Sequence, residues 1–134
     1  MNFNVVIVDD DALVLFLHRT VIERSLLPKN TYGFRNAKDA LDFLYEKREK
    51  DMPFLVLLDI NMPEVNGWDF LKELQDKKFR KKIFVVMVTS SINTADVNKA
   101  KSFPQVVDYV EKPLNQKMCE RVFHKMQCLL QNPN

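Results

Sequence analysis

Short apolar runs and longer helical patterns alternate along the chain. Three runs are apolar throughout and rich in β-branched residues, which is typical of strands covered on both faces of a parallel sheet. These runs are residues 5–8, 54–58 and 83–88. Weaker runs at 31–34 and 106–110 indicate two further strands, the first of them at a sheet edge. The pattern therefore predicts five strands, three of which are central.

Between these runs, apolar residues recur at the spacing of one helical face. The clearest stripe is Ala37, Ala40, Leu41, Leu44 and Tyr45. Similar stripes are Leu13, Phe16, Leu17, Thr20 and Val21 near the start, and Met118, Val122, Met126 and Leu129 near the end. Two more helices are predicted at 66–76 and 94–103, and the second is the less apolar. We expect each stripe to face the sheet.

A strand followed by a helix, five times over, requires right-handed crossovers and produces an open parallel sheet with helices on both faces. The length fits an α/β, flavodoxin-like (βα)5 doubly wound fold with the strand order 2-1-3-4-5. In such sheets, ligands bind outside the carboxyl ends of the strands, at the switch point between strands 1 and 3. The polar residues at that edge are therefore the candidates for chemistry.

Composition narrows the class of protein. The chain has 134 residues, 46% of them apolar, and a formal charge of +2, as expected for one ordinary domain. Its only glycines, Gly33 and Gly67, are not followed by lysine. A phosphate-binding loop of the G-x-x-x-x-G-K type and a three-glycine dinucleotide motif are therefore excluded.

Neither a membrane segment nor a signal peptide is predicted. No apolar run is longer than the one at 83–88, which is far below the roughly 20 residues that a membrane helix needs, and the N-terminus lacks a positively charged start. We therefore expect a cytoplasmic protein.

Cys119 and Cys128 lie on roughly opposite faces of one predicted helix and cannot form a disulfide with each other. His124 and Cys128 are one turn apart, which leaves a shared metal as an alternative.

Unusual polar residues follow four of the predicted strands. They are Asp9, Asp10 and Asp11 after the first strand, Asp59 after the third, Thr89, Ser90 and Ser91 after the fourth, and Lys112 with Pro113 after the fifth. In the predicted order, strands 1 and 3 are neighbours, so Asp9, Asp10 and Asp59 should meet in one pocket. Thr89 and Lys112 should flank that pocket.

Three carboxylates held together repel one another and need a cation to stay ionised. Hard oxygen ligands suit Mg²⁺, which keeps several waters and commonly bridges to phosphate. Lys112 and Thr89 would complete a clamp for a phosphoryl group, with Asp59 as the candidate nucleophile. An aspartate after a strand can instead cap a helix, and we assign that role to Asp11.

Together these residues resemble the receiver domains of two-component response regulators, and the chemotaxis-regulator type in particular. The resemblance spans essentially the whole chain. The segments that carry it are Val8-Asp9-Asp10, Leu57 to Gly67 around Asp59, Val88-Thr89-Ser90, and Tyr109-Val110-Glu111-Lys112-Pro113.

The resemblance implies that Asp59 accepts a phosphoryl group from a sensor histidine kinase or a histidine phosphotransfer protein. Asp10 and Asp59 would bind Mg²⁺ directly, Asp9 would hold it through water, and the backbone carbonyl of Asn61 would add another oxygen. Lys112 would pair with the phosphoryl oxygens, and Thr89 would donate a hydrogen bond to one of them. Such a protein catalyses only its own phosphorylation and slow autodephosphorylation.

The resemblance also implies a switch. Movement of Thr89 opens space into which Tyr109 can turn, and the helix at 94–103, strand 106–110 and the last helix form the face that a downstream protein reads. Tyr109 could instead be an ordinary strand aromatic. Asn61 and Ser91 occupy positions that vary in the family and influence the lifetime of the phosphoryl group.

Only residues 131–134 remain after the last predicted helical segment, so we expect a single receiver domain over 1–134 with no output domain. The basic run at 77–82 could suggest nucleic acid. Because it lies in a predicted loop, a solvated charge run is the favoured interpretation, and no direct nucleic-acid partner is expected.

Two other functions remain open. One is an aspartate-nucleophile phosphohydrolase of the haloacid dehalogenase type, with Asp9 as the nucleophile. The order of Asp9, Asp11, Thr89 and Lys112 along this chain is similar to the order of the catalytic residues in that family. That family needs a further acidic pair after the lysine, but only Glu120 follows Lys112 here, and Asp59 would be unexplained. The other is a binding module that uses the fold without phosphorylation.

Overall fold

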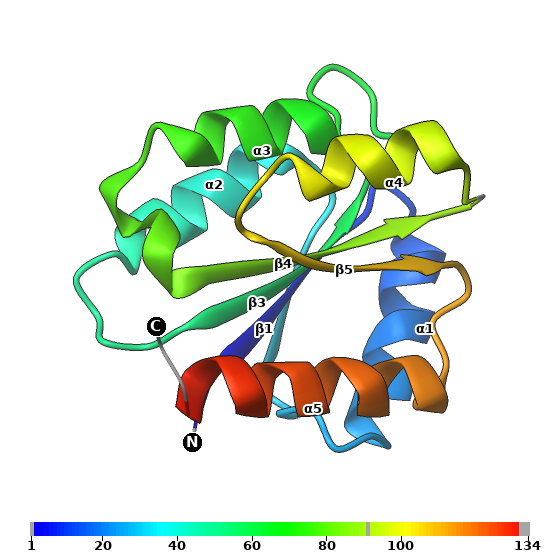
Figure 1. Cartoon of the computed structure of the whole chain (residues 1–134). Helices are drawn as coiled ribbons and strands as arrows, with labels where there is room; N and C mark the ends of the chain where they lie inside the picture. The colour runs from blue at the N-terminus through cyan, green and yellow to red at the C-terminus, as the bar shows by residue number, and fades with distance from the viewer. Residues whose placement is uncertain (1, 91, 132–134) are drawn as a thin grey trace.

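The computed structural model describes residues 2–90 and 92–131 of the chain, as five strands, five α-helices and one short 3₁₀ helix (Figure 1). In chain order they are β1 (Asn4–Val8), α1 (Ala12–Glu23), β2 (Thr31–Phe34), α2 (Ala37–Glu46), β3 (Phe54–Asp59), α3 (Gly67–Gln75), η1 (Lys78–Lys82), β4 (Ile83–Thr89), α4 (Thr94–Lys101), β5 (Val106–Glu111) and α5 (Gln116–Gln131).

The strands form one parallel sheet in the order β2-β1-β3-β4-β5. This confirms the predicted α/β topology and the position of β1 beside β3. Every residue of β3 is buried, and β1 and β4 are each buried except at one position. Unbroken apolar runs are required there because both faces of these strands are covered by helices.

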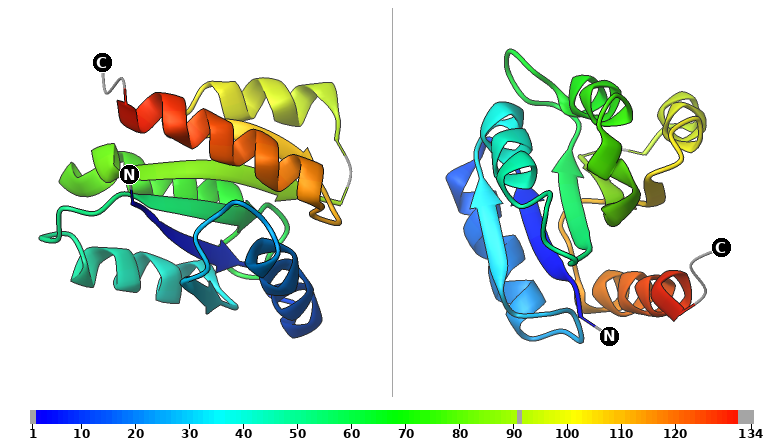
Figure 2. Two further views of the ribbon diagram at one scale, coloured as in Figure 1. Left: turned by 90° about the horizontal axis from the view of Figure 1, so that it is seen from below. Right: turned by 90° about the vertical axis from the view of Figure 1, so that its left-hand side faces the viewer.

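Two apolar clusters hold the layers together. Helices α2, α3 and α4 cover one face of the sheet, and α1 and α5 cover the other (Figure 1). The left view of Figure 2 shows α5 and α1 lying across the second face. The sheet is therefore the shared middle layer of the fold.

The predicted buried face of α1 is wrong. Leu13, Phe16 and Leu17 are 64%, 58% and 51% exposed, whereas the buried residues of α1 are His18 and Ile22. Residues 12–17 are all apolar, so several faces of this helix had apolar stripes of similar quality. Packing against the sheet selected the face that carries His18 and left an apolar surface in solvent.

Two other predicted stripes are correct except at one edge. Tyr45 of α2 is 52% exposed and Leu129 of α5 is 36% exposed, although the rest of each stripe is buried or half-buried. In α5 the most deeply buried residues are Cys119, Val122 and Met126. Both cysteines are free, which agrees with the expectation that they do not pair.

Short polar side chains begin the helices. Asp11 accepts a hydrogen bond from the Leu13 amide at 2.9 Å, which confirms its predicted capping role at α1. Asn36, Asn66 and Asn93 cap α2, α3 and α4 in the same way. Helix α4 has one buried residue, Ala100, and is the least anchored of these helices, as its sequence indicated.

The basic run before β4 is a 3₁₀ helix rather than the predicted loop, and one of its lysines has a structural role. The Lys82 ammonium group donates to the carbonyls of Arg48 and Lys50 at 2.9 and 2.7 Å. These carbonyls follow α2, so Lys82 ties the end of that helix to the start of β4. No helix in the described part of the chain is long and apolar enough to cross a membrane.

Candidate functional site

Three carboxylates meet at the carboxyl edge of the sheet. Asp9 and Asp10 follow β1, Asp59 ends the neighbouring β3, and one oxygen of each lies within 4.8 Å of the others. Asp9 and Asp59 are only 2% and 3% exposed. Within the described residues, these three are the cluster of acidic, histidine or cysteine ligands that could hold a metal ion. The alternative pair of His124 and Cys128 belongs to no such group.

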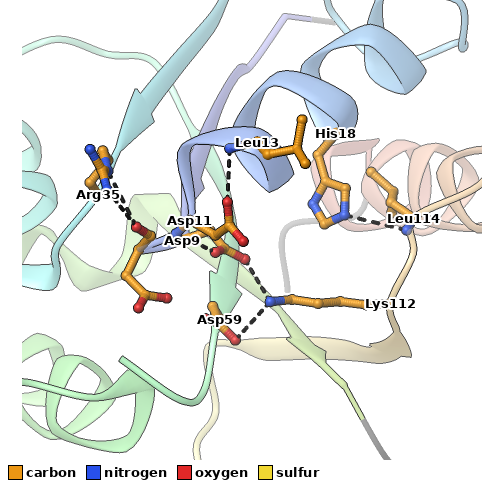
Figure 3. Close-up of polar contacts among 9 residues, drawn as sticks. Asp9, Asp11, Leu13, His18, Arg35, Asp59, Lys112 and Leu114 are labelled. Atoms are coloured by element: carbon orange, nitrogen blue, oxygen red, sulfur yellow. Dashed lines mark hydrogen bonds and ion pairs between the residues drawn. The ribbon is translucent and has the colours of Figure 1, made fainter. Parts of the chain in front are cut away.

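Lys112 closes the site from β5. Its ammonium group lies 2.7 Å from Asp9 Oδ2 and 3.2 Å from Asp59 Oδ1 (Figure 3). The Lys112 amide donates to the Thr89 carbonyl at 2.7 Å, so the ends of β4 and β5 are joined at this point. The structure therefore brings together the residues that the strand ends predicted.

Burial and charge set the protonation of the pair. Burial and the neighbouring charge of Asp9 raise the pKa of Asp59 to about 6, although Lys112 and the Asn61 backbone lower it in part. Burial lowers the pKa of the Lys112 ammonium group, but the hydrogen bond with Asp9 and the charge of Asp59 outweigh burial, so that pKa is raised. Lys112 is thus charged at neutral pH, and Asp59 loses its proton just below neutral pH.

This raised pKa predicts that Asp59→Asn stabilises the metal-free protein. Because the folded chain holds the Asp59 proton more tightly than the unfolded chain, stability falls as pH rises from about 4 to about 6, and the penalty is complete above that. Removing the carboxylate should raise the free energy of unfolding at pH 7.5 by on the order of 2 kcal/mol. The gain should shrink toward pH 4.5 in urea unfolding with EDTA. The exposed Asp51→Asn is the control, and an equal gain at both pH values would contradict the prediction.

The loop between β3 and α3 packs tightly under Asp59. An ideal Cβ on Gly67 would lie 2.7 Å from the Asp59 carbonyl oxygen and 2.9 Å from the Ile60 Cα. Asn66 and Asp69 form a reciprocal capping box at the start of α3. The closeness of Gly67 therefore fixes where Asp59 sits relative to α3.

Thr89 and Tyr109 lie on the neighbouring strands β4 and β5. Thr89 ends β4 and is 3% exposed. The hydroxyl oxygen of Tyr109 is buried, and burial raises the pKa of this group. Tyr109 packs against the apolar cluster that includes Ala100 of α4. Ser91 lies outside the described residues.

Two residues of the site were missed from the sequence. Arg35, between β2 and α2, donates from Nε and Nη2 to the Asp10 carbonyl at 3.2 and 3.1 Å. His18 of α1 is 3% exposed and its Nε2 lies 3.5 Å from the Leu114 amide, two residues beyond Lys112 (Figure 3). Burial lowers the pKa of His18. Arg35 directly follows β2 but belongs to no recognisable motif, and His18 lies inside α1, so no sequence signal singled them out.

The donor set fits a hard divalent cation. Three carboxylate oxygens at the sheet edge, with the Lys112 ammonium group beside Asp9 and Asp59, supply the ligands and partial charge balance that Mg²⁺ prefers. Thiolates, which would favour softer metals, are missing from this acidic cluster. The chemistry of the three carboxylates therefore fits Mg²⁺.

Comparisons with known proteins agree with this geometry. The family model of the response regulator receiver domain matches residues 5–123. The polar-differentiation response regulator DivK of Brucella anthropi is 34% identical over 115 residues, which cover 86% of this chain and 88% of that protein. The probable methanogenesis regulatory protein FilR2 of Methanothrix harundinacea is 30% identical over 115 residues, 84% of this chain and 74% of that protein.

A solved structure extends the similarity to three dimensions. A two-component response regulator from Cytophaga hutchinsonii superposes with a TM-score of 0.86 at 28% identity, covering 93% of this chain and 96% of that one. The family match, the sheet order and the relatives agree on one assignment. The chain belongs to the response regulator receiver domains of two-component signalling, a family that binds Mg²⁺ through acidic residues.

Proposed function

We propose that the chain is a phosphorylation-controlled regulator in which Asp59 accepts a phosphoryl group, with Mg²⁺ as cofactor, from a histidine kinase or a histidine phosphotransfer protein. The observation that carries the proposal is the buried Asp59 within reach of both Lys112 and two further carboxylates. A carboxylate at the end of a strand whose charge is partly balanced by a fixed lysine is suited to act as a nucleophile.

In the proposed reaction, a carboxylate oxygen of Asp59 attacks phosphorus as the bond from phosphorus to the donor's histidine nitrogen breaks. Asp9, Asp10, Asp59 and the Asn61 carbonyl would hold Mg²⁺, which would neutralise charge between Asp59 and the phosphoryl oxygens. Lys112 would pair with a second phosphoryl oxygen. The Thr89 hydroxyl would donate a hydrogen bond to a third.

The readout would be the face formed by α4, β5 and α5. Phosphorylation adds nearly two negative charges beside Lys112 and Thr89. A pocket of about 310 Å³ lies next to Tyr109, between α4 and β5, and α4 is anchored by one buried residue. These features support a small shift of α4 and Tyr109 that a downstream protein would read.

Trp68 provides a test of this proposal. It follows Gly67, is 9% exposed, and stacks on Phe103 with Lys99 of α4 lying 4.6 Å from its ring. We expect Trp68 fluorescence to change when Mg²⁺ and beryllofluoride are added together and to stay constant with either alone. Asp59→Asn should abolish the response. An unresponsive native protein would favour the phosphorylation-independent binding module.

The exposed apolar surface of α1, made by Leu13, Phe16 and Leu17, supports a protein as the phosphodonor. This surface begins two residues after Asp11, close in sequence to Asp9 and Asp10. Large apolar side chains that are exposed together on a surface typically mark a site that binds a partner. We propose that the phosphodonor docks on this α1 surface and so brings its phosphohistidine to Asp59.

Docking predicts a selective defect for Phe16→Gln. Because aromatic residues at the centre of an interface often contribute about 2 kcal/mol or more, the KM for a phosphorylated histidine kinase should rise at least roughly tenfold. Phosphorylation by acetyl phosphate, which needs no docking surface, should be unchanged. Leu26→Gln, at a position 56% exposed just beyond the C-terminal end of α1, is the matched control. Equal loss with both donors would argue against docking at α1.

A further inference from the structure

The three carboxylates of the site are held in different ways. Asp9 and Asp59 are fixed by the Lys112 ammonium group, and Asp9 Oδ1 also accepts the Asp11 amide at 2.9 Å. Within residues 2–90 and 92–131, the Asp10 carboxylate has no hydrogen-bond or ion-pair partner. The backbone of Asp10 therefore determines where this carboxylate points.

Arg35 holds that backbone. Its guanidinium group makes two hydrogen bonds to the Asp10 carbonyl, at 3.1 and 3.2 Å, across 25 residues of sequence. Figure 3 shows Arg35 on the side of Asp9 opposite to Lys112. The Asp9 amide donates to the Phe34 carbonyl at 3.0 Å, so the end of β2 secures both neighbouring residues of the acidic turn.

We propose that Arg35 is a positioning residue for the metal site: by fixing the Asp10 carbonyl, it keeps the Asp10 carboxylate turned toward Asp59 for Mg²⁺. The inference rests on the proposed function. A planar guanidinium with two donors on one oxygen restrains direction as well as distance. A carboxylate with two side-chain torsions then needs little further ordering when the cation binds.

Positioning and simple electrostatics predict opposite effects of Arg35. A positive charge near three carboxylates repels Mg²⁺, so loss of that charge alone would tighten binding. Loss of the restraint on Asp10 would weaken binding, because the carboxylate would have to be ordered by the cation itself. The direction of the change in affinity therefore separates the two roles.

The experiment measures the Kd for Mg²⁺ alone by titration calorimetry on the full chain. We expect Arg35→Met to raise the Kd by roughly five- to tenfold, the factor expected for loss of hydrogen bonds from a charged donor. Arg35→Lys, which retains the charge and one donor, should recover part of the affinity. Lys38→Met removes an exposed positive charge three residues further along the chain that makes no contact with Asp10, and it should leave the Kd unchanged or lower it slightly.

Melting in EDTA separates positioning from general stability. A purely structural contact would lower the melting temperature of Arg35→Met and leave its Mg²⁺ affinity at the native value, which would overturn the proposal. Tighter Mg²⁺ binding by Arg35→Met would overturn it as well and assign Arg35 a purely electrostatic effect. If the native chain binds Mg²⁺ and forms a phosphoryl adduct while Arg35→Met behaves identically, only this inference fails. A native chain that binds no Mg²⁺ removes the proposed function and this inference together.

Discussion

Replacing Lys112 with methionine is expected to slow phosphorylation by Mg²⁺ and acetyl phosphate at least roughly tenfold, because a fixed cation at the phosphoryl oxygens is lost. Lys112 also lowers the pKa of Asp59. In its absence that pKa should rise above about 6, so that a larger fraction of Asp59 is protonated at pH 7 and is a poor nucleophile. Both effects act in the same direction on the rate.

The same substitution should destabilise the protein at neutral pH. Lys112 is the ammonium group between Asp9 and Asp59, and removing one member of a buried ionic group typically costs about 3 kcal/mol or more. The loss should be smaller at pH 5, where Asp59 is protonated. Urea unfolding in EDTA at the two pH values and intact-mass kinetics measure the two effects. Lys117→Met, at an exposed position in α5, is the control, and native rates in Lys112→Met would contradict the role of Lys112.

Replacing Gly67 with alanine is expected to lower the melting temperature by roughly 5–10 °C, corresponding to about 2 kcal/mol. The added methyl group would meet the Asp59 carbonyl and the Ile60 Cα, both backbone atoms that cannot move without shifting the loop after β3. Because this loop positions Asp59, the yield of phosphoryl adduct should fall as well.

The other glycine provides the matched control. A Cβ on Gly33 would meet the Nη2 atom of Arg19 at 2.9 Å, which is the end of a flexible side chain that can move away. Neither glycine has a positive φ, so the comparison tests space rather than backbone conformation. Gly33→Ala should have a nearly native melting temperature. Similar melting temperatures for the two variants would contradict tight packing under Asp59.

The sheet and the acidic cluster could be predicted because both follow from patterns along the chain. The apolar runs that precede Asp9, Asp59 and Lys112 specify strands. The ends of these parallel strands place the three side chains at one edge of the sheet. Once the strand order is known, the convergence of the carboxylates needs no further information. The site is therefore largely determined by the topology.

The missed features depend on tertiary packing. In α1 nearly every early position is apolar, so periodicity could not tell that His18 would be buried and Phe16 exposed. The contacts of Arg35 and Lys82 are made to backbone carbonyls. Every residue has a backbone carbonyl, so a contact with one leaves no recognisable pattern in the sequence. Only the folded chain shows which carbonyl each cation reaches.

The central claim, that Asp59 is the phosphoryl acceptor, is tested most directly by intact-mass measurement after incubation with Mg²⁺ and acetyl phosphate. We predict a single phosphoryl adduct on the native protein, labile in alkali and stable in acid, that is missing in Asp59→Asn and in samples with EDTA. An adduct that persists in Asp59→Asn would contradict the claim. Steady release of phosphate that Asp9→Asn abolishes, with no adduct on Asp59, would instead identify a phosphohydrolase with Asp9 as its nucleophile.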